Sequence, residues 1–121
     1  MAGRIKALIK PDYQAEYKRA KEQGDERPYE EIKNELYKLY FINSIKNRET
    51  CLVKVADFTN NAFLINGLPD ADRRRLGKKY LPAADYLRDF LLHLSDETHP
   101  LFEFKDMLLE RTEHFIREEA R

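Results

Sequence analysis

A cluster of positive charge is the most visible chemical feature of the sequence. Five cations fall within seven residues: Arg73, Arg74, Arg75, Lys78 and Lys79. Cationic side chains can neutralise the phosphates of DNA or RNA, and the ring of Tyr80, next in the chain, could stack on a base. Segment 73–79 is therefore a candidate nucleic-acid-binding site.

The same segment also fits a solvated helix that binds nothing. Asp70 and Asp72 precede Arg73 and Arg75 by three residues, which is the spacing of intrahelical ion pairs. Acids at the start of such a helix and lysines at its end also suit the helix dipole. We favour this interpretation, with nucleic-acid binding and an acidic protein partner as the alternatives.

Histidines and carboxylates recur at a four-residue spacing in two places, at Asp89, His93 and Glu97 and again at Glu110 and His114. Facing helices of a bundle can build metal sites from such residues. Here each set lies on the side of its helix opposite the expected core residues, and the Glu-x-x-His spacing of di-iron bundles is absent. We therefore expect no metal site and no cofactor.

Asp57 is the best single candidate for a catalytic residue. With Lys54 and Asn61 it forms the only polar stripe of a very apolar segment, and burial would raise the pKa of its carboxyl into a range useful for acid–base chemistry. Such a stripe more often faces water or pairs internally. No glycine-rich phosphate loop, nucleophile elbow or Cys-x-x-Cys pair is present, so we expect a non-catalytic protein.

Aromatic side chains suggest a second kind of site. Phe41, Tyr86 and Phe102 fall off the main apolar sides of their expected helices. If these rings are exposed and adjacent, they would form a patch for binding another protein.

Composition limits the class of protein. The 121 residues fit one domain spanning 1–121, and the 22 basic and 22 acidic residues cancel, which argues against a surface that binds polyanions throughout. The single Cys51 cannot form an internal disulfide, and we expect it to be a small buried hydrophobe. The first 13 residues lack the apolar core of a secretory signal, and no run approaches the ~20 apolar residues that span a bilayer. We expect a soluble cytoplasmic protein.

The element most able to organise the fold is a helix over 51–65. At about 100° per residue, Cys51, Val55, Phe58 and Ala62 share one side, and further apolar residues extend nearly all round. This pattern predicts the most buried helix of the protein. Asn66-Gly67 and Pro69 would end it.

Other segments are also predicted to be helical. Segment 12–23 predicts an outer brace, and 28–47, 82–94 and 100–119 predict core helices, with Pro82 and Pro100 at two of the starts. Because no glycine or proline separates 28–47 from 51–65, one long helix over 28–65 is an alternative, although we prefer two helices. Residues 1–10 are expected to be frayed or loosely docked.

Together these patterns predict an all-α, single-domain helical bundle of four main helices plus a short basic helix near 70–79. An all-α bundle hosts many unrelated functions, so the fold alone does not choose a function.

Two functions from different classes remain. The preferred one is protein–protein interaction, as an adaptor, a regulatory subunit or a self-associating module such as a homodimer, because the segments 36–45 and 51–65 are apolar nearly all round. The alternative is a nucleic-acid-binding protein that uses segment 73–79. It predicts that these cations share a face with others, such as Arg4, Lys6 and Lys10.

Overall fold

A computed structural model describes residues 11–119, with no description of the side chains of Asn66 and Glu119. The expectation that residues 1–10 are frayed or loosely docked lies outside the described residues, as do Arg4, Lys6 and Lys10 of the nucleic-acid alternative.

The protein is all-α, as predicted, and residues 11–119 contain no strand. Five α-helices are described: α2 Tyr13–Glu22, α3 Tyr29–Lys46, α4 Cys51–Ala62, α5 Asp70–Leu92 and α6 Lys105–His114. Three short helical segments are also described: η1 Ile65–Gly67, η2 Phe102–Phe104 and η3 Phe115–Glu119. None of the described helices is both long enough and apolar enough to cross a membrane.

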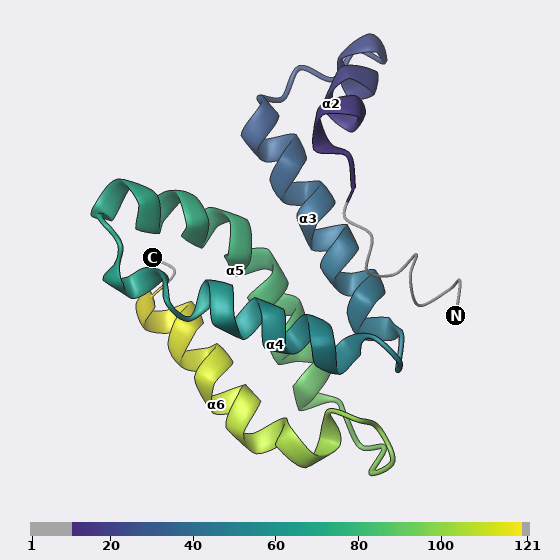
Figure 1. Cartoon of the computed structure of the whole chain (residues 1–121), viewed down its shortest axis with the longest axis vertical. Coiled ribbons are helices and arrows are strands. Elements are labelled where there is room, and N and C mark those ends of the chain that lie inside the picture. The colour runs from purple at the N-terminus through teal and green to yellow at the C-terminus, as the bar shows by residue number, and fades with distance from the viewer. Residues whose placement is uncertain (1–10, 120–121) are drawn as a thin grey trace.

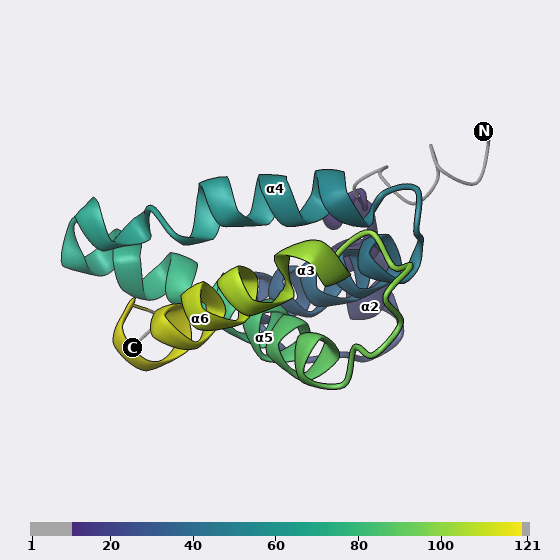
Figure 2. The same cartoon turned by 90° about the horizontal axis from the view of Figure 1, so that it is seen from below.

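Helix α5 lies at the centre of the arrangement. It packs against α3 on one side and α6 on the other, and α4 contacts both α3 and α5. Figure 2 shows α4 as a separate layer laid across the layer that contains α3, α5 and α6. Helix α2 packs on α3, at the end of the molecule far from α6, and buries no residue (Figure 1). It is the outer brace that the sequence predicts.

An aromatic cluster joins these layers. The ring of Phe58 on α4 is fully buried and lies 5.0 Å from the ring of Phe41 on α3, centroid to centroid. It also lies 5.9 Å from Tyr80 on α5 and 6.4 Å from Phe115 in η3. Because four separate elements contribute to one cluster, the packing of Phe58 couples α4 to the rest of the core.

The inward side of α4 is the one that the periodicity predicts. Cys51, Phe58 and Ala62 are 0% exposed and Val55 is 5% exposed. Among the described α-helices, α4 also has the largest share of buried residues, as expected: five of its 12, against six of 18 in α3 and six of 23 in α5. Helix α4 lies on the outside of the molecule, has neighbours on one side only, and leaves Leu52 and Val53 in solvent. Helix α5 packs against more elements than α4 does, and its Ala83, Ala84, Leu87 and Leu91 are 0% exposed.

Two helices, not one, span 28–65. Helix α3 ends at Lys46 and α4 begins at Cys51, which confirms the preferred alternative. The buried hydroxyl of Thr50 donates a hydrogen bond of 2.7 Å to the carbonyl of Ser44, and the carbonyl of Asn47 accepts from the amide of Cys51 at 3.0 Å. These contacts satisfy backbone groups at the break and fix the angle at which α4 leaves α3.

Pro82 does not begin a helix, contrary to expectation. The predicted short basic helix at 70–79 and the predicted helix at 82–94 form one continuous helix, α5, with Pro82 inside it. Proline removes one backbone hydrogen bond and normally breaks a helix. Here Tyr80, Ala83 and Leu87 are buried along the same side of α5, so their packing against the core offsets the lost bond.

The last predicted helix, 100–119, starts later than expected. Pro100 lies in a turn, η2 follows it, and the α-helix proper begins only at Lys105. Leu101, Leu108 and Phe115 are buried, whereas Phe104 is 40% exposed. A 3-10 segment before α6 and a π segment after it shift the direction of the side chains, which a uniform α-helical period cannot anticipate.

Candidate functional site

The basic cluster is split by the structure into two groups. Arg74, Arg75 and Lys78 line one pocket of about 280 Å³ between α3 and the first half of α5. Arg73 turns away, with a side chain only 22% exposed and 3.9 Å from the carboxylate of Asp70. Lys79 lies over the rings of Tyr37 and Tyr80. Three of the five predicted cations are therefore brought together.

Tyr80 cannot stack on a nucleic-acid base, which is the role that the sequence suggested. Its side chain is 7% exposed and its ring packs against Phe58 and Tyr37, at centroid distances of 5.9 and 5.5 Å. Burial raises the pKa of its hydroxyl above the ordinary value. A base would have no access to this ring, so Tyr80 is a core residue and not a stacking platform.

The predicted aromatic patch is not formed as expected. Phe41 is 0% exposed, because α4 and α5 cover it from two sides and place Phe58 and Tyr86 against its ring. Tyr86 and Phe102 are half-buried and pack against the core. The prediction that Phe41 belongs to an exposed patch is therefore wrong: the apolar side of α3 is wider than a single stripe.

The polar stripe of α4 pairs internally. Lys54 is 2% exposed, and its ammonium lies 4.3 Å from the centroid of the Tyr40 ring and 3.3 Å from the carboxylate of Asp57. Asn61 donates a hydrogen bond of 3.3 Å to the other oxygen of that carboxylate. Asp57 itself is 51% exposed, so it acts as the counter-ion of a buried lysine. The sequence placed Lys54 on a polar stripe and gave no sign of its burial.

The histidine sites lack a complete ligand set. The Nδ1 atom of His93 lies 3.5 Å from the carboxylate of Asp89, and both side chains are more than 70% exposed. They line an open pocket of about 410 Å³ beside Tyr86 and Phe90. Among residues 11–119, no group of three His, Cys, Asp or Glu side chains has the arrangement needed to hold a metal ion.

His99 has a defined structural role. Its Nδ1 atom accepts a hydrogen bond of 3.0 Å from the amide of Leu101, and its ring packs edge-on against Phe90. Desolvation, with a smaller contribution from the charge of Arg48, lowers the pKa of His99 below its usual 6.5. The neutral ring therefore closes the turn that leads into η2.

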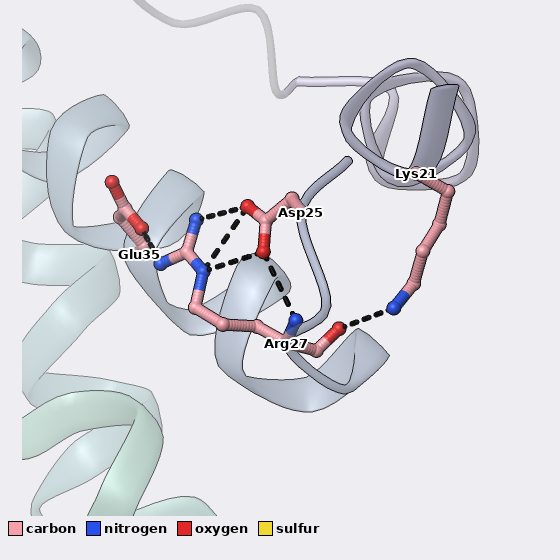
Figure 3. Close-up of polar contacts among 4 residues, drawn as sticks. All are labelled: Lys21, Asp25, Arg27 and Glu35. Carbon is pink, nitrogen blue, oxygen red and sulfur yellow. Dashed lines mark hydrogen bonds and ion pairs between the residues drawn. The ribbon is translucent and has the colours of Figure 1, made fainter. Parts of the chain in front are cut away.

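An ion-pair network holds the connection between α2 and α3 (Figure 3). The guanidinium of Arg27 bonds the carboxylate of Asp25 at 2.8 Å and also contacts that of Glu35 on α3. Lys21 donates a hydrogen bond of 2.8 Å to the carbonyl of Arg27. The bonds from Arg27 lower the pKa of Asp25 to about 2. Because these charges are engaged with one another, the network fixes the loop and is poorly suited to hold a ligand.

The single cysteine is buried, as predicted. Cys51 is 0% exposed and its sulfur lies 3.5 Å from the carbonyl of Arg48. Desolvation raises the pKa of its thiol, which disfavours the reactive thiolate. Cys51 is thus part of the core of α4 and not a nucleophile.

One exposed apolar surface was not predicted from the sequence, because its residues were expected to be buried in the core. We call it the α4 face and define it by the exposed side chains of Leu52, Val53, Ala56, Asn60 and Leu64. Leu52 is 44% exposed, Val53 58% and Leu64 71%. The signal that points to it is the apolar surplus of 51–65, since a helix apolar nearly all round needs neighbours on several sides and a small domain supplies few.

Comparisons with known protein families, with curated proteins and with solved structures found no match to this chain.

Proposed function

We propose that this chain acts by binding protein rather than by catalysis, that it binds through the α4 face, and that its partner is a second copy of itself. The observation that carries the proposal is the exposure of Leu52 and Val53 on α4 and of Leu64 just after its end. Exposed apolar residues that share one side of an element mark interaction sites more often than scattered ones do.

The charge pattern supports self-association. Charged residues make up 36% of the chain, yet among the exposed side chains between residues 51 and 64 the only ionisable group is Asp57, which pairs with Lys54. In a two-fold symmetric contact a surface meets its own copy, so like charges on it would repel. The charge of Asp57, at the edge of the α4 face, is offset by its pairing with Lys54. The small Ala56 of this face would let two helices approach closely, and the amides of two Asn60 side chains can bond each other.

The oligomeric state tests the proposal directly. Light scattering after size exclusion should show a dimer, and Val53→Glu plus Leu64→Glu should convert it to a monomer with unchanged helical circular dichroism, because two buried carboxylates oppose the contact. Leu39→Glu plus Met107→Glu is the matched control, since these residues are 50% and 58% exposed but lie outside the α4 face. The control variant should remain a dimer.

Two results would reject self-association through this face. One is a chain that stays monomeric at about 100 μM, where even a weak dimer would be populated. The other is a dimer that the control variant disrupts as much as the Val53 and Leu64 variant does.

Nucleic-acid binding is the second candidate function. It is supported by Arg74, Arg75 and Lys78 lying together and is weakened by the inward turn of Lys79 and the burial of Tyr80. Titration with labelled DNA and RNA at two salt concentrations tests it, because phosphate contacts must weaken steeply as salt rises.

A further inference from the structure

A small pocket lies where the start of α3 meets the start of α5. It has a volume of about 280 Å³ and is lined by Glu30, Asn34, Ala71, Arg74, Arg75 and Lys78. The two walls differ in character, because α5 supplies the cations and α3 supplies a carboxylate and an amide. None of these residues belongs to the α4 face, so a ligand in this pocket would bind whether or not the chain forms a dimer.

Positive charge at the pocket is largely uncompensated. Within residues 11–119, Arg74 and Lys78 make no ion pair or hydrogen bond. The guanidinium of Arg75 is 3.9 Å from the carboxylate of Asp72, with both side chains 53% exposed, so this is a weak surface pair. Arg74 and Lys78 are four residues apart and therefore project on one side of α5. An anion at this place would meet two or three cations at once.

The wall from α3 offers a hydrogen-bond acceptor. Glu30, whose carboxylate accepts hydrogen bonds only, lines the pocket and favours a ligand that brings O–H or N–H groups to it. The Oδ1 atom of Asn34 has no hydrogen-bond partner, but it is closed to solvent and therefore does not face the pocket.

We propose that this pocket binds a small phosphomonoester that also carries hydroxyl or amino groups. Arg74, Arg75 and Lys78 hold the phosphoryl group, and Glu30 accepts hydrogen bonds from the rest of the molecule. The volume is near the lower end of ligand sites, which run from about 300 to 1,000 Å³, so a compact ligand fits better than a large cofactor.

A nucleic-acid strand fits the same surface less well. A polyanion needs a long stripe of cations, whereas Arg73 and Lys79 are turned away from the pocket. The exposed carboxylates of Asp70 and Asp72 stand in the first turn of α5, one helical turn from the cations. A chain of phosphates running along α5 would meet both of these negative charges in addition to Glu30 of the pocket, so repulsion opposes a polyanion more than a single phosphoryl group.

Calorimetric titration of the full chain with defined probes tests the assignment. The probes are ribose 5-phosphate, inorganic phosphate and ribose. Ribose 5-phosphate should bind at least tenfold more tightly than either of the others, because only it offers both a phosphoryl group and sugar hydroxyls. The comparison with inorganic phosphate separates recognition of an ester from recognition of the free ion.

Two pocket variants and one control assign the binding to residues. Arg74→Gln plus Lys78→Gln should weaken ribose 5-phosphate at least tenfold. Glu30→Leu should leave ribose 5-phosphate bound no more tightly than inorganic phosphate, since the hydroxyl donors then lose their acceptor. Lys18→Gln plus Lys46→Gln removes the same charge from exposed positions outside the pocket lining and should change nothing. Circular dichroism of each variant checks that it is folded.

Several results would overturn the proposal. These are no heat from ribose 5-phosphate at about 10 mM, where even weak binding is measurable; equal affinity for inorganic phosphate; or equal loss in the control variant. Labelled RNA or DNA that binds more tightly than ribose 5-phosphate, and is lost in the Arg74 and Lys78 variant, would instead establish the nucleic-acid alternative.

Discussion

The ammonium of Lys54 and the carboxylate of Asp57 lie 3.3 Å apart, although Lys54 is 2% exposed and Asp57 is 51% exposed. The pair thus connects a buried charge to one that water still reaches. The ring of Tyr40, 4.3 Å from the ammonium, provides a further favourable electrostatic contact. A buried ammonium without compensation is costly, so Asp57 is expected to matter for stability more than an exposed carboxylate usually does.

A double-mutant cycle measures this coupling. Asp57→Asn should lower the free energy of unfolding by about 1–2 kcal/mol in the natural background and by much less in Lys54→Met, which gives an interaction of about 1 kcal/mol. Lys54→Met alone should be close to neutral, because replacing a buried charge by an apolar side chain of similar volume often costs little. Urea unfolding at neutral pH provides all four values. A coupling of zero would show that Asp57 does not compensate the buried ammonium.

Phe58 should be the most sensitive single position of the aromatic core. Its ring is 0% exposed and packs against rings from α3, α5 and η3. Phe58→Ala should therefore cost about 3–5 kcal/mol, the range seen when a large buried ring is replaced by a methyl group. Leu92→Ala, at a side chain that is 52% exposed, should cost less than about 1 kcal/mol. Similar losses from both changes in chemical denaturation would contradict the assignment of Phe58 to the core.

The periodicity of 51–65 predicted which side of α4 faces the core, because spacing records the direction of each side chain along a helix. It did not predict that Leu52 and Val53 are exposed, since the number of neighbouring helices is set by the whole fold. The burial of Lys54 was not predicted from the sequence for a related reason. Its stem is apolar, and the rings that cover it come from α3, a separate element.

The candidate sites show the same difference between what local sequence predicts and what depends on the packing of separate helices. Segment 73–79 was identified because its charges are adjacent in the chain, and the structure brings Arg74, Arg75 and Lys78 to one pocket. Asn34 and Glu30 complete that pocket from α3, which no local pattern could indicate. Pro82 was interpreted as a helix start because proline is common there, but tertiary packing of α5 outweighs that preference.

His99 should make stability fall as the solution is acidified below neutrality. Its pKa is lower in the folded chain than the ordinary 6.5, so the unfolded chain binds the proton more readily in the window below that value. The contribution of the neutral ring is complete above about pH 6.5 and is lost as the pH falls through the window. Protonation at Nδ1 would also remove the acceptor for the amide of Leu101.

Replacement of His99 separates its contribution from that of other groups. His99→Asn keeps an oxygen that can accept from the Leu101 amide but does not titrate. Thermal or urea unfolding between about pH 7.5 and about pH 5.5 should then show a smaller loss of stability in this variant than in the natural chain. Identical pH dependence in the two proteins would mean that His99 contributes nothing in this range.

Asp25 should titrate far below an ordinary aspartate. Hydrogen bonds from Arg27, first from its guanidinium and then from its amide, lower the pKa of this carboxyl from 3.8 to about 2. A depressed pKa means that the ionised form is favoured by folding. The stabilisation of the loop is therefore complete above about pH 4 and disappears as the pH falls toward 2.

A pH titration followed by carbon-detected NMR of the Asp25 carboxyl measures this pKa directly. Arg27→Gln should return it close to 3.8, because the guanidinium bonds are the largest cause of the shift, whereas Lys21→Gln should move it only slightly, because the charge of Lys21 is the smallest cause. Both variants remove one positive charge, so the difference between them measures the hydrogen bonds and not the general field. Equal shifts in the two variants would show that Asp25 responds to net charge alone, and the loop between α2 and α3 would then not depend on the contact between Asp25 and Arg27.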